Sequence, residues 1–496
     1  MLFTSTRSRC AVSSAEAISR GLATDGGLFV PQSFPQITAQ DIDFLADADY
    51  KERAKFIIGK YLTDYTADEL AYCVNGAYDG TFDNDLPAPV VEIAPGKNIL
   101  ELWHGPTCAF KDMALQILPY LLGTAVNKCA PGRTTVILVA TSGDTGKAAL
   151  DGFADVPMTK IIVFYPQDGV SDMQKLQMTT QKGANVAVCG IEGNFDDAQS
   201  GVKEIFSDPE MQALLKSADM EFSSANSINF GRLVPQVVYY VSAYCDMVKA
   251  GRIANGDAVN VAVPTGNFGN ILAAYYAKEM GLPIARFICA SNSNNVLTDF
   301  INTGIYDRNR KFFTTISPSM DILISSNLER LLYHLYEGDC DAVAKLMASL
   351  KSTGKYEVSA EVKAKLQKLF YGNCCDDTET KAAIAKTFAS CSYLCDTHTA
   401  VAVDVYDKFA AETADKTPCI IASTASPYKF APAVLEAVGG TCSGNGFEVM
   451  DSLAKASGTQ VPAPLASLKN CEVLHKNSIA KTDMAAFIKS LVATWK

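Results

Sequence analysis

Short apolar runs recur along the chain, and each is followed by a turn rich in glycine or hydroxyl residues and then by a helical pattern. TTVILVA (134–140) is continuously apolar, which is typical of a strand covered on both faces. The other runs are MTKIIVFYP (158–166), ANVAVCG (184–190), AVNVAVP (258–264), ARFICAS (285–291) and CIIAS (419–423). Strands that alternate with helices predict parallel sheets in an α/β fold. Ligands of such sheets bind beyond the carboxyl ends of the strands, where the polar turns fall.

The beginning of the chain departs from this rhythm. Residues 1–95 are predicted to form a separate, mostly helical region. Helical periodicity runs over residues 51–74, and Thr66 is expected to cap the second helix there. The proline-rich LPAPVVEIAPGKN (86–98) predicts an edge strand and a turn.

A second departure is the helical pattern that fills residues 315 to 390 and interrupts the alternation of strands and helices. We interpret it as an inserted subdomain. The expected division is an N-terminal domain (1–95), a large domain (96–130 and 236–496, with the insertion) and a small domain (131–235).

Composition excludes several classes of protein. The 496 residues are 48% hydrophobic and 20% charged, as in an ordinary globular protein. A net charge of −11 argues against a nucleic-acid partner or a membrane surface, and no apolar run approaches a membrane span. The first residues, MLFTSTRSRC, lack the apolar centre of a secretory signal, and the 15 cysteines are irregularly spaced, so we expect a reduced, cytoplasmic protein. The spacing of Cys374, Cys375, Cys391 and Cys395 does not match zinc ligands, and no metal is expected.

NILELWHGPTCAFKDMALQILPYLL (98–122) holds the first candidate for chemistry. An apolar run ends at Trp103, a helix pattern starts near Ala109, and Lys111 lies in its first turn. The positive end of the helix dipole and the apolar neighbours both lower the pKa of this amine. A partly neutral amine suits a Schiff-base lysine. The alternative is an ordinary lysine whose amine reaches solvent.

A phosphate cradle is predicted at TGNFGN (265–270), between a strand and a helix. Its glycines permit close backbone approach, and amide hydrogens at a helix N-terminus favour a phosphate. It is neither the dinucleotide G-x-G-x-x-G nor a P-loop, and GDTGK (143–147) lacks the P-loop spacing. A purely structural turn is the alternative.

A carboxylate cradle is predicted at TSGDTG (141–146), which offers the hydroxyls of Thr141, Ser142 and Thr145. Because Asp144 repels a highly charged ligand, a carboxylate fits better than a diphosphate. The alternative is a helix cap made by Ser142 or Asp144.

Further polar candidates lie in two other segments. In SANSINFGRLVPQ (224–236), Asn229, Arg232 and Gln236 share one helical face that suits an anionic substrate or, equally, solvent. Thr424 places a hydroxyl at the end of the strand CIIAS. A buried lysine, a phosphate site and a partner for a ring nitrogen are what pyridoxal phosphate requires. A hydroxyl partner leaves the pyridine largely unprotonated, since a neutral alcohol does not stabilise the added charge.

The chain resembles threonine synthase, in the branch shared by enteric bacteria and fungi. The segments that carry the resemblance are, in order, LATDGGLFVP, HGPTCAFKDMALQ, ATSGDTG, NSIN, PTGNFGN, SPSMDILISSNLERLL, DTHTAV and STASPYKF. The resemblance implies the type II fold of pyridoxal-phosphate enzymes, related to the tryptophan synthase β chain. It also implies pyridoxal 5'-phosphate as cofactor, Lys111 as Schiff-base residue and base, and Thr424 facing the ring nitrogen. The expected phosphate ligands are Gly266, Asn267, Phe268, Gly269 and Asn270, and the expected substrate ligands are Thr141, Ser142, Asp144, Thr145, Asn229 and Arg232.

The implied activity is that of a carbon–oxygen lyase in threonine biosynthesis, which converts O-phospho-L-homoserine and water to threonine and phosphate by γ-elimination and β-addition of water. Arg232, Lys147 and Lys429 are candidates for the substrate phosphate. His104 is a candidate supporting residue, and the alternative, which is the commoner role of such a histidine, is a purely structural one. Two alternatives stay open: a phospho-lyase acting on O-phosphothreonine or O-phosphoserine, and a non-catalytic binding protein on the same scaffold. The expected partner is a phosphorylated amino acid, and the protein is expected to be a monomer or a homodimer. Lys147, Asn270 and Ser426 depart from the family's usual residues.

Overall fold

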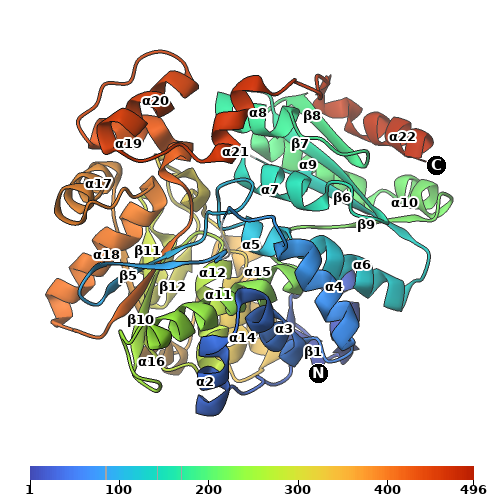
Figure 1. Cartoon of the computed structure of the whole chain (residues 1–496). Coiled ribbons are helices and arrows are strands. Elements are labelled where there is room, and N and C mark those ends of the chain that lie inside the picture. The colour runs from blue at the N-terminus through green and yellow to red at the C-terminus, as the bar shows by residue number, and fades with distance from the viewer. Residues whose placement is uncertain (84–85, 142, 169, 496) are drawn as a thin grey trace.

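Two mainly parallel sheets lie side by side and form the body of the protein (Figure 1). The computed structural model describes residues 1–83, 86–141, 143–168 and 170–495. The six-stranded sheet has the order β14 (Phe370–Cys374), β11 (Ile284–Ser291), β10 (Val259–Pro264), β15 (Cys419–Ser423), β5 (Lys97–Glu101) and β4 (Val90–Ala94). The five-stranded sheet has the order β16 (Ser478–Ala480), β8 (Val186–Glu192), β7 (Thr159–Pro166), β6 (Thr134–Ala140) and β9 (Met220–Ser223). The predicted α/β class with parallel sheets is confirmed.

Helices cover both sheets. On the six-stranded sheet pack α13 (Val296–Thr303), α16 (Ala360–Leu369) and α18 (Thr397–Thr413). The other helices of the second half of the chain are α14 (Leu328–Leu335), α15 (Cys340–Thr353), α17 (Asp377–Cys391), α19 (Ala431–Ala437), α20 (Gly446–Ser457) and α21 (Ala463–Ala466). Around the five-stranded sheet lie α7 (Asp144–Phe153), α8 (Asp172–Thr179), α9 (Phe195–Ser207), α10 (Pro209–Lys216) and α22 (Met484–Trp495). The helices α5 (Asp112–Leu115), α11 (Phe230–Lys249) and α12 (Gly269–Glu279) occupy the middle, and α6 (Leu118–Cys129) lies to the right, next to the N-terminal helices (Figure 1). No helix in the described part of the chain is long and apolar enough to cross a membrane.

The N-terminal region is helical, as predicted, with a small sheet at its start. This sheet has the order β2 (Val12–Ser13), β1 (Leu2–Ser5) and β3 (Phe29–Pro31), and the helices are α1 (Ser14–Arg20), α2 (Ala39–Asp47), α3 (Tyr50–Tyr61) and α4 (Ala67–Tyr78). The predicted cap at Thr66 is confirmed, because its side chain accepts from the Glu69 amide in a full capping box. The predicted edge strand is β4, which pairs antiparallel with β5.

The structure departs from the sequence-based division in three places. β14 lies inside the segment expected to be a helical insertion, yet it pairs with β11 as an edge strand of the six-stranded sheet. β16 and α22 pack on the five-stranded sheet, although residues 236–496 were assigned to the large domain. The boundary at residues 235–236 falls within α11. Short edge strands and returning termini carry little periodicity, so only their pairing partners reveal where they belong.

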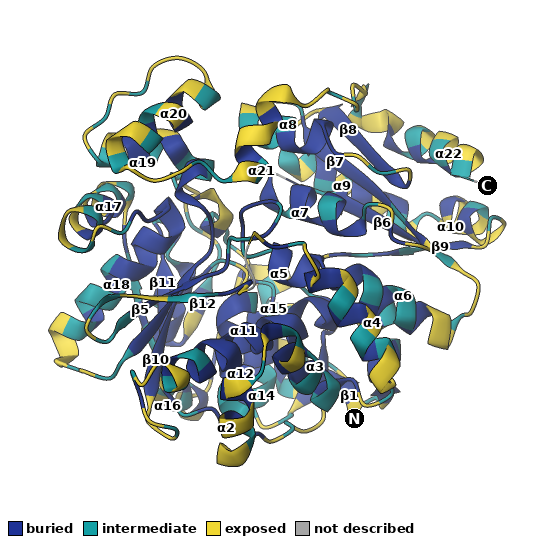
Figure 2. Cartoon of the chain, viewed as in Figure 1, coloured by how far each residue is buried: buried dark blue, intermediate teal, exposed yellow. Residues whose placement is uncertain are grey.

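The helix α11 lies at the centre of the main hydrophobic core. Almost all its residues are buried, including the polar Arg232 and Gln236, and Figure 2 shows this helix and the strands of both sheets as buried. Phe230, at its start, packs edge-on against Phe3 with ring centroids 4.6 Å apart. A helix that is apolar on all faces is expected in such a position, between layers of other elements. α11 therefore brings Arg232 and Gln236 into the interior.

Candidate active site

Three neighbouring parallel strands deliver the main candidate groups to one edge of the six-stranded sheet. β10, β15 and β5 are adjacent and parallel, so their carboxyl ends meet at the same edge. The phosphate cradle follows β10, Thr424 follows β15, and the loop that ends at Lys111 follows β5. In the other sheet the adjacent strands β6 and β9 lead to the carboxylate cradle and to Asn229.

Lys111 directly precedes α5, and the segment before it is tied to Thr424. The Phe110 amide donates to the Thr424 carbonyl at 2.8 Å, and Ala109 forms an antiparallel bridge with Ala425. These backbone contacts hold the lysine beside the end of β15. The Thr424 side chain is buried, and within the described residues its hydroxyl has no hydrogen-bond partner.

The environment of the Lys111 amine lowers its pKa. It lies 4.8 Å from the centre of the Phe110 ring, and none of the described residues accepts a hydrogen bond or forms an ion pair with it. Burial lowers the pKa of this amine; the Asp144 carboxylate opposes that effect, and the charges of Lys429 and Arg232 add to it. The net lowering enlarges the neutral fraction that can attack a carbonyl.

The loop before Lys111 is held by a buried carboxyl. Asp112 accepts hydrogen bonds from the Thr107 amide at 2.8 Å and from the Thr107 hydroxyl at 2.6 Å. Burial raises the pKa of Asp112 to about 7 in spite of these bonds. A Cβ at Gly105 would lie 2.6 Å from the Asp112 side chain, so glycine is required there.

The phosphate cradle presents unused backbone donors. Phe268 has left-handed geometry (φ 62°) and turns the chain into α12, whose N-terminus has no side-chain cap. In the described structure the amides of residues 266–270 donate to no protein group. A Cβ at Gly266 would meet the Ser319 carbonyl oxygen at 2.9 Å, and Asn267 is exposed. Unsatisfied amides at a helix N-terminus suit a phosphate.

Asn270 adds a side-chain donor to this cradle. Its Oδ1 accepts from the Tyr239 hydroxyl at 2.8 Å and from the Tyr240 hydroxyl. Its Nδ2 is buried and has no partner among the described residues. Because buried polar groups are normally paired, this amide indicates a ligand acceptor nearby.

The carboxylate cradle is only partly available to a ligand. The Thr141 hydroxyl accepts from the amides of Gly143 at 3.0 Å and Gly146 at 2.9 Å, so it shapes the loop itself. Thr145 is partly exposed, and within the described chain its hydroxyl is unpaired. Ser142 lies outside the described residues. The predicted cap by Asp144 is absent from the described contacts: Gly143 is the N-cap of α7 and Asp144 begins it.

Asp144 forms an ion pair that the sequence did not predict. Its Oδ1 lies 3.0 Å from the Lys429 Nζ and accepts from the side-chain Nε2 of Gln174 at 3.2 Å. Burial by itself raises the pKa of this carboxyl, but the charges of Lys429 and Lys111 outweigh burial and hold the pKa well below its usual range.

The two α11 candidates differ in availability. Asn229 is the N-cap: it accepts from the Gly231 amide at 2.8 Å and donates to the Ile18 carbonyl at 2.9 Å. Arg232 donates through Nη1 to the Ala225 carbonyl at 2.5 Å, while its Nε is buried and unpaired within the described chain. Burial lowers the pKa of Arg232 to about 10, so it stays charged at neutral pH.

His104 is held between two carboxylates. Its ring nitrogens lie 2.8 Å from Asp83 and 2.8 Å from Glu101, and the ring stacks on Trp103. Burial lowers the pKa of the imidazole, but the two carboxylates outweigh burial and raise it overall. These contacts favour the structural interpretation of His104.

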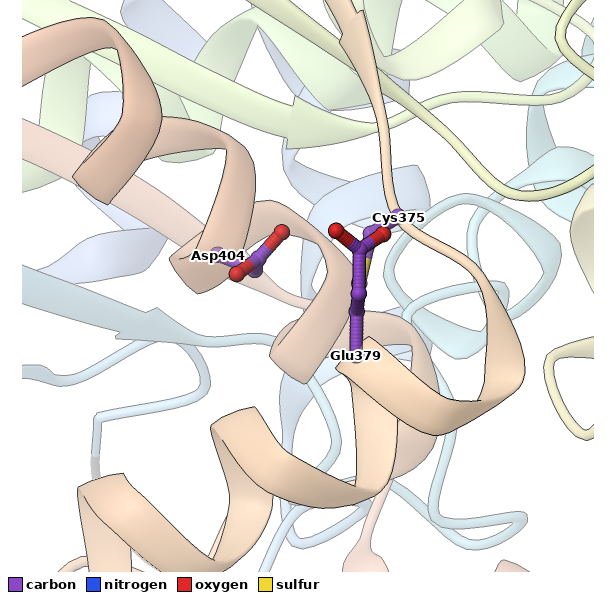
Figure 3. Close-up of side chains that lie close together, drawn as sticks. All are labelled: Cys375, Glu379 and Asp404. Carbon is purple, nitrogen blue, oxygen red and sulfur yellow. The ribbon is translucent and has the colours of Figure 1, made fainter.

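Cys375, Glu379 and Asp404 bring their ligand atoms within 4.8 Å of one another (Figure 3). The Lys408 amine lies 2.9 Å from Glu379 and 2.7 Å from Asp404, so a cation of the chain already pairs with both carboxylates. Burial raises the pKa of the Cys375 thiol, which disfavours a thiolate ligand. The cluster is therefore accounted for as an ion-pair network.

Several residues that support the site were not identified as site residues from the sequence. Tyr239 and Tyr240 orient Asn270 but lie in an apolar helix, where tyrosines are ordinary core residues. Arg330 donates to Asn327, which in turn holds the carbonyl of Asn267 in the phosphate cradle at 3.0 Å. Apart from Arg330 and Asn327, these partners are far apart along the chain, so only the fold brings them together.

Comparison with known proteins agrees with this geometry. Three family descriptions match in order: threonine synthase N terminus (residues 2–78), pyridoxal-phosphate dependent enzyme (99–354) and threonine synthase, C-terminal (399–481). The middle match alone covers more than half of the chain and places it among the pyridoxal-phosphate-dependent enzymes, which is the class that the fold and the site define. Within that class, the chain belongs to the threonine synthase family. The expected family and fold are thus confirmed.

Individual relatives support the same assignment. Human "Threonine synthase-like 1" is 44% identical over 434 residues, which are 86% of this chain and 58% of the relative. The chain thus spans little more than half the length of that relative. The threonine synthase of Pseudomonas aeruginosa is 38% identical over 88% of this chain and 90% of its own. The crystal structure of pyridoxal-phosphate-bound threonine synthase from Brucella melitensis is 36% identical and superimposes with a TM-score of 0.87, covering 100% of this chain and 99% of that one.

Proposed function

We propose that this protein is a threonine synthase that converts O-phospho-L-homoserine and water into L-threonine and phosphate, with pyridoxal 5'-phosphate as its cofactor. The observation that carries the proposal is the arrangement at the ends of β10, β15 and β5, where Lys111, the phosphate cradle and Thr424 meet at one edge of the sheet. Membership of the threonine synthase family supports the choice of reaction.

The residues at this edge fit pyridoxal phosphate. The unpaired amides of residues 266–270 and the orphaned Nδ2 of Asn270 would hold the phosphate. Lys111 would hold the aldehyde carbon, and the unpaired hydroxyl of Thr424 would meet the ring nitrogen. The bound cofactor supplies an electron sink for negative charge that develops on the substrate's carbon atoms.

Residues of the chain itself transfer the substrate's Cα proton and bind its carboxylate. The Lys111 amine, with its lowered pKa, accepts the proton from Cα of the substrate and later returns it. The N-terminus of α7 and the free hydroxyl of Thr145 bind the substrate carboxylate. Burial of the surrounding side chains excludes water from competing for these contacts.

Arg232 is the cation best placed for the substrate phosphate. Of the two other candidates, Lys147 lies 3.0 Å from Asp151 and also donates to Gln181, while Lys429 is paired with Asp144. Arg232 alone of the three has an unpaired buried N–H in the described structure, and its charge acts on Lys111.

Replacing Arg232 with alanine is expected to lower kcat/KM for O-phospho-L-homoserine by about 10²-fold or more, because a buried charge-assisted contact is lost. Steady-state kinetics together with inhibition by inorganic phosphate measure this, and the inhibition constant for phosphate should rise in parallel. Lys147→Met is the matched control and should leave phosphate inhibition unchanged. A larger effect of Lys147→Met on phosphate inhibition would contradict the assignment.

A product assay tests the proposed reaction itself. Purified protein supplied with the cofactor and O-phospho-L-homoserine should release L-threonine and phosphate in a one-to-one ratio, as measured by chromatography and a phosphate assay. The same assay is run with O-phosphothreonine and O-phosphoserine. A 2-keto acid and ammonia in place of threonine would identify a phospho-lyase, and the proposed function would then be wrong.

A further inference from the structure

A buried ion pair joins the two sheets next to the site. Lys429 lies in the 3₁₀ helix η2 (Pro427–Phe430), which follows β15, and Asp144 begins α7, which follows β6. The Lys429 Nζ and the Asp144 Oδ1 are 3.0 Å apart, and the two side chains are only 2% and 5% exposed. Nearly complete burial makes the pair unlike the exposed ion pairs of the surface.

The Lys429 amine has no donor to spare. Besides Asp144, it donates to the Thr107 carbonyl at 2.8 Å, in the loop that leads to Lys111. It also donates to the Gln177 side chain at 3.4 Å, in α8 of the five-stranded sheet. An ammonium group has three N–H donors, and these three acceptors use them all. Binding a substrate phosphate would require Lys429 to leave Asp144 as an unpaired buried carboxylate, which is strongly unfavourable.

The net charge of the pair affects whether an anionic substrate group can bind at the N-terminus of α7. The positive end of a helix dipole is equivalent to roughly half an elementary charge. Alone, it does not offset the full negative charge of Asp144 in the first turn of α7. With Lys429 in place the pair is neutral, and the positive end of α7 then attracts an anion.

We propose that Lys429 is a positioning residue that neutralises Asp144 and thereby allows the N-terminus of α7 to accept the carboxylate of an amino acid. The inference rests on the proposed function, because it takes the ligand of this cradle to be an amino acid. It assigns Lys429 a role away from the substrate phosphate, and it explains how a carboxylate can bind beside an aspartate.

The first arm of the experiment needs no amino-acid ligand. Thermal unfolding is measured for the cofactor-loaded wild type, Lys429→Met, Asp144→Asn and the double variant. Lys429→Met should lower the unfolding midpoint most, since it leaves Asp144 buried and unpaired, and the double variant should recover part of the loss. If the change in unfolding midpoint of the double variant equalled the sum of the two single changes, the proposed pairing would be overturned.

The second arm measures L-threonine affinity from the visible absorbance of the bound cofactor. Lys429→Met should weaken L-threonine binding by about tenfold or more, the double variant should return to within about threefold of wild type, and Lys429→Arg should retain most of the affinity. Inhibition by inorganic phosphate should be unchanged. Lys408→Met, which removes a paired lysine from α18, is the matched control and should bind L-threonine as wild type does.

The outcomes separate the inference from the proposed function. If Lys429→Met weakens phosphate inhibition more than L-threonine binding, or if the double variant stays as weak as Lys429→Met, the inference is overturned. If wild type does not bind L-threonine, the proposed function fails. The affinities of the same variants are then compared with O-phospho-L-serine as the ligand, because it presents the same α-carboxylate to the cradle.

Discussion

Replacing Lys111 with alanine is expected to reduce turnover by at least about 10³-fold, since the change removes both the nucleophile and the base. It is also expected to abolish the visible absorbance that pyridoxal phosphate has when it is joined to a lysine. The fold should persist, because no described residue accepts a hydrogen bond from the Lys111 amine. Absorbance spectra of the purified variant, product assays and circular dichroism measure the three expectations.

Two controls sharpen this result. Lys111→Arg keeps a positive charge but forms no imine, so it should be as inactive as the alanine variant. Lys345→Ala removes an exposed lysine of α15 and should behave as wild type. Normal turnover in Lys111→Ala would end the assignment of an imine-forming lysine. If Lys111→Ala lost turnover but kept the visible absorbance of the wild type, the role of Lys111 would instead be limited to proton transfer.

The largest loss of stability is expected from Arg330→Met. Arg330 is fully buried, and its guanidinium donates to the Phe29 carbonyl at 2.9 Å, to the Asn327 side chain at 2.5 Å and to the Ile228 carbonyl at 2.5 Å. Methionine leaves three buried acceptors without partners, each of which costs about 1–3 kcal/mol. Relief of the buried charge offsets part of this, so we expect a net loss of about 3 kcal/mol in the free energy of unfolding.

The same substitution should also weaken cofactor binding. Asn327 holds the Asn267 carbonyl through its amide at 3.0 Å and its Nδ2 at 3.2 Å, and Arg330 fixes the Asn327 side chain. Urea unfolding and cofactor titration followed by absorbance measure the two effects. Arg133→Met, at an exposed ion pair with Glu221, is the matched control, and its effect should stay below about 0.5 kcal/mol. Equal stability of the two variants would show that the Arg330 contacts contribute little.

Much of the architecture was predictable from local pattern. Apolar runs covered on both faces mark strands, so the predicted runs at 134–140 and 419–423 match β6 and β15. The cap at Thr66 follows from its own side chain and that of Glu69 three residues later. The turn at residues 265–270 and the helix after it were predictable for the same reason, since glycine, a turn and a following helix are neighbours in sequence.

Whether each polar side chain is free to bind a ligand was not predictable, because this depends on hydrogen-bond and ion-pair partners that only the fold brings close. Thr141 was expected to meet a ligand, but its hydroxyl binds the amides of its own loop. Lys147 and Lys429 were equal candidates with Arg232, and long-range contacts with Gln181 and Asp144 separate them. The placement of β14 was equally hidden, because pairing with β11 decides it and its own residues do not.

The sequence by itself determined the α/β class and most strands of the two main sheets, since spacing and residue type along the chain govern these features, and it singled out the two cradles and Lys111 as candidates. Tertiary structure alone decided which polar groups remain free and which charges are already matched. The physical reason is that many hydrogen bonds and buried ion pairs form between residues that are distant in the chain and close in space, as the 3.0 Å contact between Asp144 and Lys429 shows.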